Sequence, residues 1–220
     1  MGFVDLLKER AKKSIKTIVL PETEDMRTIE ATDKILKEGV AKIILIGNEE
    51  EINKKAAEGG FDISGATIVD PETSDRTQAY IDKFVELRAK KGMTPEKAKE
   101  ILHTQYPYYG VMMVKMGDAD GMVSGACHST ADTLRPCLQI LKTKPGTKLV
   151  SAFFLIVVPD CEYGANGAFV FADSGLNQNP TPEELSAIAA SSAESFQLLV
   201  EEEPIVAMLS HSTKGSAKHA

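Results

Sequence analysis

Long apolar runs are missing from this sequence. It contains no stretch of about 18 consecutive apolar residues, so we expect no segment that spans a membrane. The first residues mix charges of both signs, at Asp5, Lys8, Glu9 and Arg10, and lack the apolar segment that a signal peptide needs. We therefore expect neither a membrane partner nor a secretory leader.

Clustered positive charge is also missing. The formal net charge is −7, and lysine and arginine are scattered among aspartate and glutamate. Binding to a nucleic-acid backbone needs basic side chains gathered on one surface, so nucleic acid is not an expected partner. Small anionic ligands stay open, because a few well-placed arginines are enough to bind one.

Cysteine is sparse and carries no metal-site spacing. The three cysteines, Cys127, Cys137 and Cys161, are odd in number and form no CxxC pair, which argues against a disulfide framework or a zinc site. His128 lies in no HxxxH pattern. We expect no metal, and the reducing cytoplasm as the compartment.

What the sequence does contain is a regular alternation of helix and strand patterns. Helices are expected over residues 3–14, 24–38, 49–58, 77–91, 108–116 and 131–142, with another opening at 94–96. Strands are expected over residues 17–20, 41–46, 66–69 and 120–123. Strand, helix and strand within about thirty residues is typical of a βαβ unit, whose strands are parallel and buried. The pattern predicts an α/β fold with a largely parallel sheet.

The sequence Lys144-Pro145-Gly146 is the best candidate for a domain boundary. We therefore expect a first domain over residues 1–145 and part of a second over residues 146–220. The second part has apolar runs at 149–158 and 167–172, a capped helix opening at 181–184 and a strand pattern at 205–209. Because the chain stops in a loop soon after that strand, the second domain is expected to be incomplete.

The most promising ligand site follows the strand at 120–123. Ser124 and Gly125 begin a turn, Ser129 and Thr130 precede a helix, and Arg135 lies about one turn inside it. Free backbone N–H groups, hydroxyls and a guanidinium group together favour an anion such as phosphate. The alternative is that Ser129 or Thr130 simply caps the helix and Arg135 is a solvated surface residue.

Three weaker candidates lie elsewhere. Ser212, Thr213 and Lys214 follow a strand pattern and resemble a phosphate loop in composition, but the P-loop spacing is absent and a plain polar loop explains them too. Arg88 ends a helix face, where a cation often only compensates the helix dipole. Cys161 lies near a strand end, but nothing nearby in the sequence suggests an activated thiol.

Several strings resemble one family. IVLPE, ELRAKKGMT, DGMVSGACHSTADTLRPCLQILKT, VFADSGLNQNPT and MLSHSTKGSAKH occur in the order and spacing of bacterial short-chain phosphate acetyltransferases. The similarity runs from about Thr17 to Lys218. Any one string is weak evidence, whereas together they are specific.

The resemblance implies a fold and an activity. Family members transfer acetyl reversibly between coenzyme A and phosphate, so acetyl-CoA, phosphate, acetyl phosphate and coenzyme A are the implied substrates and no cofactor is needed. The implied fold is two three-layer α/β/α domains of the isocitrate/isopropylmalate dehydrogenase-like type, with the active site in the cleft between them, in a homodimer. Arg88 and Arg135 match arginines that bind anionic groups of the substrates, and Ser129 and Thr130 fall in the phosphate-side loop.

The resemblance also implies what these residues leave out. Family members continue further, and the later segment carries a serine–arginine pair and an aspartate thought to take the thiol proton. We therefore expect the catalytic groups downstream of Ala220 and none within the 220 residues. The 220 residues by themselves are expected to be inactive. His211 and Ala220 depart from the residues usual in the family at those positions.

Three rival functions remain open. A phosphate butyryltransferase-like enzyme would differ only in its acyl pocket. A non-catalytic anion- or nucleotide-binding α/β module fits the early stop of the chain. A nicotinamide oxidoreductase is suggested by fold analogy alone, and the sequence has no dinucleotide fingerprint to support it.

Overall fold

The computed structural model describes residues 2–210 and 212–216 and divides into two compact units. The first unit is Met1–Lys142 and the second is Thr143–Ala220. The sequence-based boundary at 145/146 lies close to this division. Predictions that concern His211, Lys218 and Ala220 fall outside the described residues.

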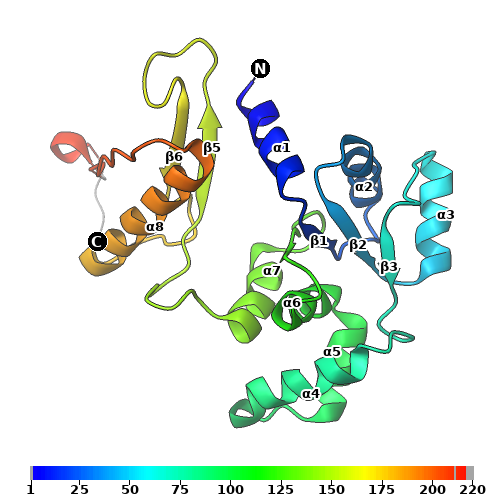
Figure 1. Cartoon of the computed structure of the whole chain (residues 1–220). Helices are drawn as coiled ribbons and strands as arrows, with labels where there is room; N and C mark the ends of the chain where they lie inside the picture. Colours follow the sequence, from blue (N-terminus) through cyan, green and yellow to red (C-terminus); the bar gives the residue numbers. More distant parts are fainter. Residues whose placement is uncertain (1, 211, 217–220) are drawn as a thin grey trace. The chain divides into compact units, whose positions relative to one another are not determined.

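The first unit contains all the strands of one sheet and most of the helices (Figure 1). Its elements are α1 (Phe3–Lys13), β1 (Thr17–Leu20), α2 (Met26–Glu38), β2 (Lys42–Ile46), α3 (Glu49–Gly59), β3 (Thr67–Val69), α4 (Thr77–Arg88), the 3₁₀ turn η1 (Ala89–Lys91), α5 (Pro95–Thr104), α6 (Tyr106–Met116), β4 (Gly121–Met122), α7 (Thr130–Pro136) and the π-helical turn η2 (Cys137–Leu141). The helix expected over residues 131–142 is thus an α-helical part and a π-helical part. The change comes at Pro136, which has no backbone N–H to continue the α-helical pattern.

The sheet of the first unit is parallel throughout, with strand order β3-β2-β1-β4. Val19 of β1 lies between Ile44 of β2 and Met122 of β4. The α/β class with a parallel sheet is therefore confirmed. All four strands end at the same edge, and this edge is where parallel α/β sheets gather their ligand-binding loops.

Local sequence signals set the helix ends. The Asp25 carboxylate accepts a hydrogen bond from the backbone N–H of Arg27 and starts α2, and the Asn48 side chain does the same for two N–H groups of α3. Gly39 ends α2 at φ 65°, a left-handed conformation that costs a glycine little. These caps fix the residues at which the loops after β1 and β2 pass into helices.

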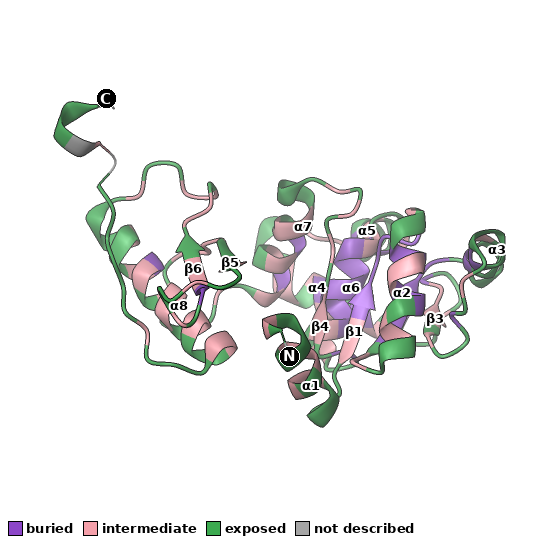
Figure 2. Ribbon diagram, turned by 90° about the horizontal axis from the view of Figure 1, so that it is seen from above, coloured by how far each residue is buried: buried purple, intermediate pink, exposed green. Residues whose placement is uncertain are grey.

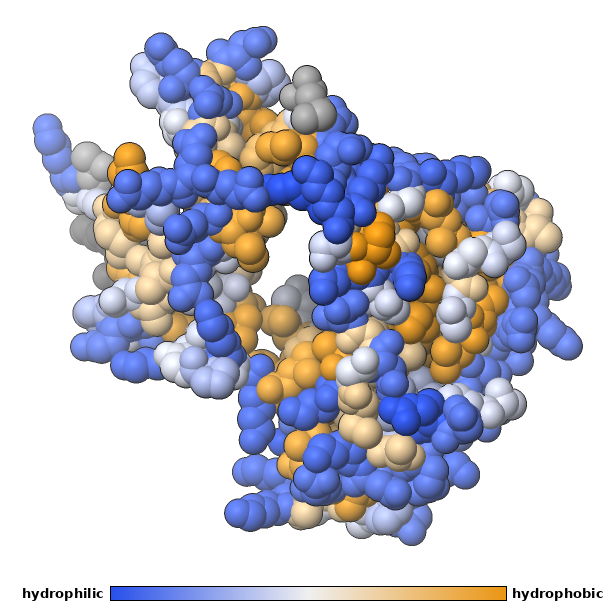
Figure 3. All heavy atoms as spheres, in the orientation of Figure 1, coloured by the Kyte–Doolittle hydropathy of each residue, from blue (hydrophilic) through white to orange (hydrophobic). Residues whose placement is uncertain are grey.

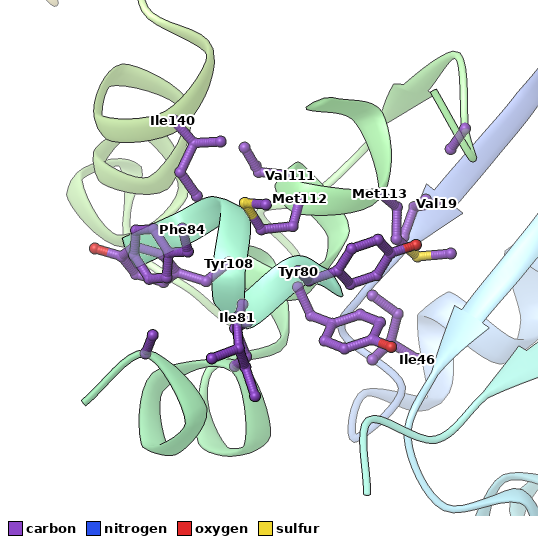
Figure 4. Packing of buried hydrophobic residues seen from close by; sticks show 14 of the residues in the cluster. Val19, Ile46, Tyr80, Ile81, Phe84, Tyr108, Val111, Met112, Met113 and Ile140 are labelled. Atoms are coloured by element: carbon purple, nitrogen blue, oxygen red, sulfur yellow. The ribbon is translucent and has the colours of Figure 1, made fainter. Parts of the chain in front are cut away.

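The core of the first unit lies on both faces of the sheet. Successive side chains of a strand point to opposite faces. Val19, Ile44 and Ile46 accordingly belong to a cluster with α4, α5 and α6, whereas Leu45 joins a second cluster with α2 and α3. Figure 2 shows α6 as largely buried, and β1 and β2 contribute further buried residues. Figure 4 shows the rings and apolar side chains of the larger cluster, whose fully buried members include Tyr80, Phe84, Tyr109, Met112 and Ile140.

The second unit is built differently from the first. Its strands β5 (Phe153–Val157) and β6 (Ala168–Ala172) pair antiparallel, α8 (Pro182–Val200) packs against β6, and the 3₁₀ turn η3 (Thr213–Gly215) follows. Figure 3 shows hydrophobic atoms at the surface of this unit, in keeping with the exposure of Phe154 and Leu198.

The strand expected over residues 205–209 is not formed in this structure. These residues are irregular, and Ile205 and Leu209 are 96% and 90% exposed. A strand needs a neighbour for its N–H and C=O groups, and no described strand pairs with this segment. Nor does any helix in the described residues have both the length and the apolar character to cross a membrane.

Candidate functional site

Two loops meet at the carboxyl edge of the parallel sheet. β1 and β4 are neighbours, with Val19 opposite Met122, so the chain leaves both strands side by side. Pro21 and Glu22 follow β1, and the 123–129 loop follows β4. The turn that contains Gly125 therefore lies against Glu22, which comes about a hundred positions earlier in the chain.

The Glu22 carboxylate fills the turn after β4. It accepts hydrogen bonds from four consecutive backbone N–H groups, those of Gly125 at 2.6 Å, Ala126 at 2.8 Å, Cys127 at 3.0 Å and His128 at 2.9 Å. Glu22 is only 2% exposed. The expectation of free N–H groups in this turn is therefore wrong, because a carboxylate of the protein itself already takes up the amides that would bind an anion.

The charge on Glu22 is held by these donors. Burial by itself raises the pKa of a carboxyl group, but the hydrogen bonds from the backbone of Cys127, Ala126 and Gly125 and from the His128 side chain outweigh it. The pKa of Glu22 therefore lies far below its ordinary value. The turn therefore encloses a negative charge at neutral pH.

The His128 ring completes this arrangement. Its Nδ1 atom lies 2.9 Å from Glu22 Oε1, and its side chain is 30% exposed. An ionised carboxylate can only accept hydrogen bonds, so Nδ1 of His128 is the donor in this contact. Nothing in the sequence pattern paired His128 with Glu22. The only signal was the position of Glu22 directly after the first strand, in the IVLPE string.

The Cys127 thiol lies in the same place but is not activated. The residue is exposed, but partial desolvation of the thiol, the hydrogen bond to Glu24 and the charges of Glu24 and Glu22 together raise its pKa to about 12. Donor atoms of Glu22, Cys127 and His128 all lie within 4.8 Å of one another. This set does not suit a metal ion, because the carboxylate oxygens already serve the backbone amides and the thiol keeps its proton.

Ser129, Thr130 and Arg135 lie just beyond this turn. Ser129 caps α7: its Oγ accepts from the N–H of Asp132 at 3.2 Å and donates to the Asp132 carboxylate at 2.6 Å. Thr130 is the first residue of α7 and is exposed. Arg135 Nη1 lies 3.3 Å from Asp132 Oδ1, so Asp132 is an anionic partner of both Ser129 and Arg135 that the sequence analysis did not weigh.

The charges of the two arginines of the resemblance both act on Tyr108. The buried phenol of Tyr108 has a raised pKa, and the charges of Arg135 and Arg88 act on it in the opposite direction. Arg88 ends α4, and its Nε atom is buried without a hydrogen-bond partner among the described residues. Ser124 Oγ is buried and unpartnered in the same sense. Buried polar atoms normally form hydrogen bonds, and neither of these two atoms has a partner in the described part of the chain.

A cleft opens where β1 and β2 end. It encloses about 470 Å³, and its lining comes from the loops after both strands and from the α5–α6 junction. The lining residues include Thr23, Glu24, Asn48, Lys55, His103, Tyr106 and His128. His128 therefore contacts the buried Glu22 and also lines this accessible cleft.

The three remaining predicted site residues lie in the second unit. Ser212 Oγ is 3.5 Å from Ser216 Oγ, and Thr213 and Lys214 form part of η3. Lys214 is exposed. The structure thus brings Ser124, Ser129, Thr130 and the two arginines into one unit, whereas Ser212, Thr213 and Lys214 stay in the other.

The chain belongs to the phosphate acetyl/butaryl transferase family, whose model matches residues 2–220. Among curated proteins, it is 56% identical over 218 residues to a phosphate acetyltransferase of Acetivibrio thermocellus, covering 99% of this chain and 65% of that protein. A phosphate acetyltransferase of Thermoanaerobacterium thermosaccharolyticum is 53% identical over 219 residues, covering 100% of this chain and 66% of that protein.

Solved structures are similar over the same extent. A phosphotransacetylase from Streptococcus pyogenes superposes with a TM-score of 0.87 at 40% identity, covering 100% of this chain and 65% of that one. The EutD phosphotransacetylase from Staphylococcus aureus gives a TM-score of 0.85 at 39% identity, covering 99% and 63%. The chain thus spans about 65% of the length of the curated relatives it matches.

Proposed function

We propose that the protein to which this chain belongs transfers an acetyl group reversibly between coenzyme A and inorganic phosphate. The observation that carries this proposal is the 56% identity with a phosphate acetyltransferase over 99% of the chain. The family description includes butyryl transfer, but the two curated relatives described above are named phosphate acetyltransferase. Coenzyme A and phosphate are substrates, and no separate cofactor is proposed.

The proposed phosphate side of the reaction is the start of α7. We assign the hydroxyls of Ser124 and Thr130 to the phosphate oxygens as donors, together with that of Ser129, whose hydrogen would have to leave the Asp132 carboxylate to reach a phosphate. The buried Ser124 Oγ supports this assignment, because an unpartnered buried polar atom is expected to gain a partner when a ligand binds. Arg135 is proposed to bind an anionic group of the substrates through its exposed guanidinium.

The proposed chemistry is direct attack of phosphate on the thioester carbonyl, with no covalent enzyme intermediate. Most of the rate then comes from holding both reactants in line and from fixed donors facing the developing oxyanion. Ser212, Thr213 and Lys214 are proposed as further substrate-binding residues from the second unit. The groups that handle the thiol proton are proposed to lie outside these 220 residues.

The finer features of the family are part of the same proposal. We infer two three-layer α/β/α domains of the isocitrate/isopropylmalate dehydrogenase-like type, divided near residue 145, a homodimer, and a cytoplasmic location. The four-stranded parallel sheet with helices on both faces supports the first of these for residues 1–145. Light scattering of the purified protein tests the dimer.

The test of function is acetyl-CoA consumption with and without phosphate. We would compare the 220-residue chain with a chimera that completes it with the remaining part of the Acetivibrio thermocellus relative. We expect phosphate-dependent release of coenzyme A from the chimera and none from the 220 residues alone. A chimera that binds coenzyme A without turnover would contradict the proposal and favour a binding module. A chimera that prefers butyryl-CoA to acetyl-CoA would identify butyryl as the acyl group that is transferred.

A further inference from the structure

The turn after β4 has the form of an anion site, and the anion in it belongs to the protein. We propose that Glu22 is a positioning residue for the acetyl transfer: its carboxylate sets the 125–128 turn and fixes His128 in the tautomer whose Nε2 accepts a hydrogen bond. The inference rests on the proposed function for its kinetic part. Its structural part can be tested without any turnover.

The first step of the argument concerns the turn itself. Four successive N–H groups converge on one carboxylate at 2.6–3.0 Å, an arrangement that a neutral side chain cannot reproduce. Gly125 adopts φ 121°, a conformation open to glycine, and so lets the amides point the same way. The turn is therefore shaped around an internal charge and has its form before any substrate arrives.

The second step concerns the imidazole. The carboxylate receives the Nδ1 hydrogen of His128 at 2.9 Å, which leaves Nε2 as the acceptor of the neutral ring. Carboxylates that fix an imidazole tautomer in this way are a recurring means of orienting histidines in active sites. The His128 side chain is 30% exposed and lines the cleft beside Thr23 and Tyr106, so the oriented ring borders an accessible space.

The third step links the turn to the proposed substrate groups. Ser129 and Thr130 follow His128 directly, so a turn that relaxes would displace both hydroxyls. A misplacement of about 1 Å of groups that hold a substrate can lower the rate about 100-fold. Glu22 has no described contact with those hydroxyls, so it acts through the turn and is a positioning residue.

The structural test uses the 220-residue chain. The variant is Glu22→Gln, which keeps the shape but adds an amide N–H₂ that can donate to His128 Nδ1. The matched control is Glu30→Gln, because Glu30 is an exposed carboxylate paired with Lys34 at 2.6 Å. The readouts are the His128 tautomer, from the ring nitrogen and carbon shifts in NMR, and the amide hydrogen exchange of residues 125–128.

We expect the Nδ1–H tautomer and slow exchange in the wild type and in Glu30→Gln. In Glu22→Gln we expect the Nε2–H tautomer and exchange at residues 125–128 at least about 10-fold faster, because bonds to a charge are replaced by weaker ones. An Nε2–H tautomer in the wild type overturns the proposal even if the variant fails to fold. Unchanged exchange in a folded Glu22→Gln overturns it as well.

The kinetic test uses the chimera described above. We expect Glu22→Gln to raise the KM for phosphate and lower kcat/KM for phosphate about 100-fold, while the KM for acetyl-CoA changes less than about twofold. A purely structural role would reduce the amount of active enzyme and so lower kcat with both KM values unchanged, and that result refutes the positioning role. A wild-type chimera without turnover refutes the proposed function instead, and with it the kinetic part of the inference. The NMR measurement then decides the structural part by itself.

Discussion

Replacement of Arg135 by alanine should separate substrate binding from stability. The guanidinium makes one 3.3 Å contact with Asp132 on a pair whose side chains are 55% and 49% exposed. Exposed pairs of this kind contribute less than about 0.5 kcal/mol, so Arg135→Ala should unfold at nearly the wild-type denaturant concentration. A charge-assisted hydrogen bond to a substrate contributes about 1.5–3 kcal/mol, which corresponds to a loss of roughly 10- to 150-fold in kcat/KM.

The assay is phosphate-dependent thiol release from acetyl-CoA by the chimera, with each substrate varied in turn. Lys34→Ala is the matched control, because Lys34 is an exposed cation in a similar intrahelical pair with Glu30. We expect the control to keep wild-type kinetics. Wild-type kcat and KM values in Arg135→Ala would refute the assignment, and so would an equal loss in the control.

Three further predictions follow from the first unit. Phe84→Ala removes a fully buried ring and should lower the free energy of unfolding by about 3–5 kcal/mol, measured by urea titration. Burial raises the pKa of Asp118, but the hydrogen bonds from Tyr80 and Arg76 outweigh it and lower the pKa. The stabilisation from these bonds is therefore present above about pH 4 and is lost as the pH falls through the lowered pKa. Thermal unfolding of Asp118→Asn should show a flatter dependence of stability on pH over this acid range. Because the pKa of Cys127 is raised to about 12, iodoacetamide at pH 8 should alkylate it more slowly than free cysteine, and mass spectrometry of the labelled peptide showing equal rates would contradict this.

The parallel sheet could be predicted because its signals are local. The apolar run Ile43–Ile46 and the short strand before Pro21 have the length and composition of buried strands, and glycines such as Gly39 mark where helices end. The cap role of Ser129 was also weighed from the sequence and is what the hydrogen bonds show. Here the residues that determine the structure are near neighbours in the chain.

The missed features depend on partners far along the chain. Glu22 and the turn after β4 are about a hundred residues apart, and no periodicity or spacing links them. The 205–209 segment has the composition of a strand, but the composition does not supply a pairing neighbour. The roles of Arg88 and Arg135 stay predictions, and the effect of both charges on Tyr108 could not have been derived from their spacing in the sequence.

The carboxylate at Glu22 also fixes the length of a surface loop. Loops at a protein surface usually accept inserted or deleted residues. Here consecutive amides from Gly125 to His128 meet a single side chain, so one added residue would turn a carbonyl oxygen toward the negative charge. A library of insertions should therefore tolerate changes after Lys144 but not between positions 125 and 128, and substitutions at position 22 should determine which loop lengths survive selection.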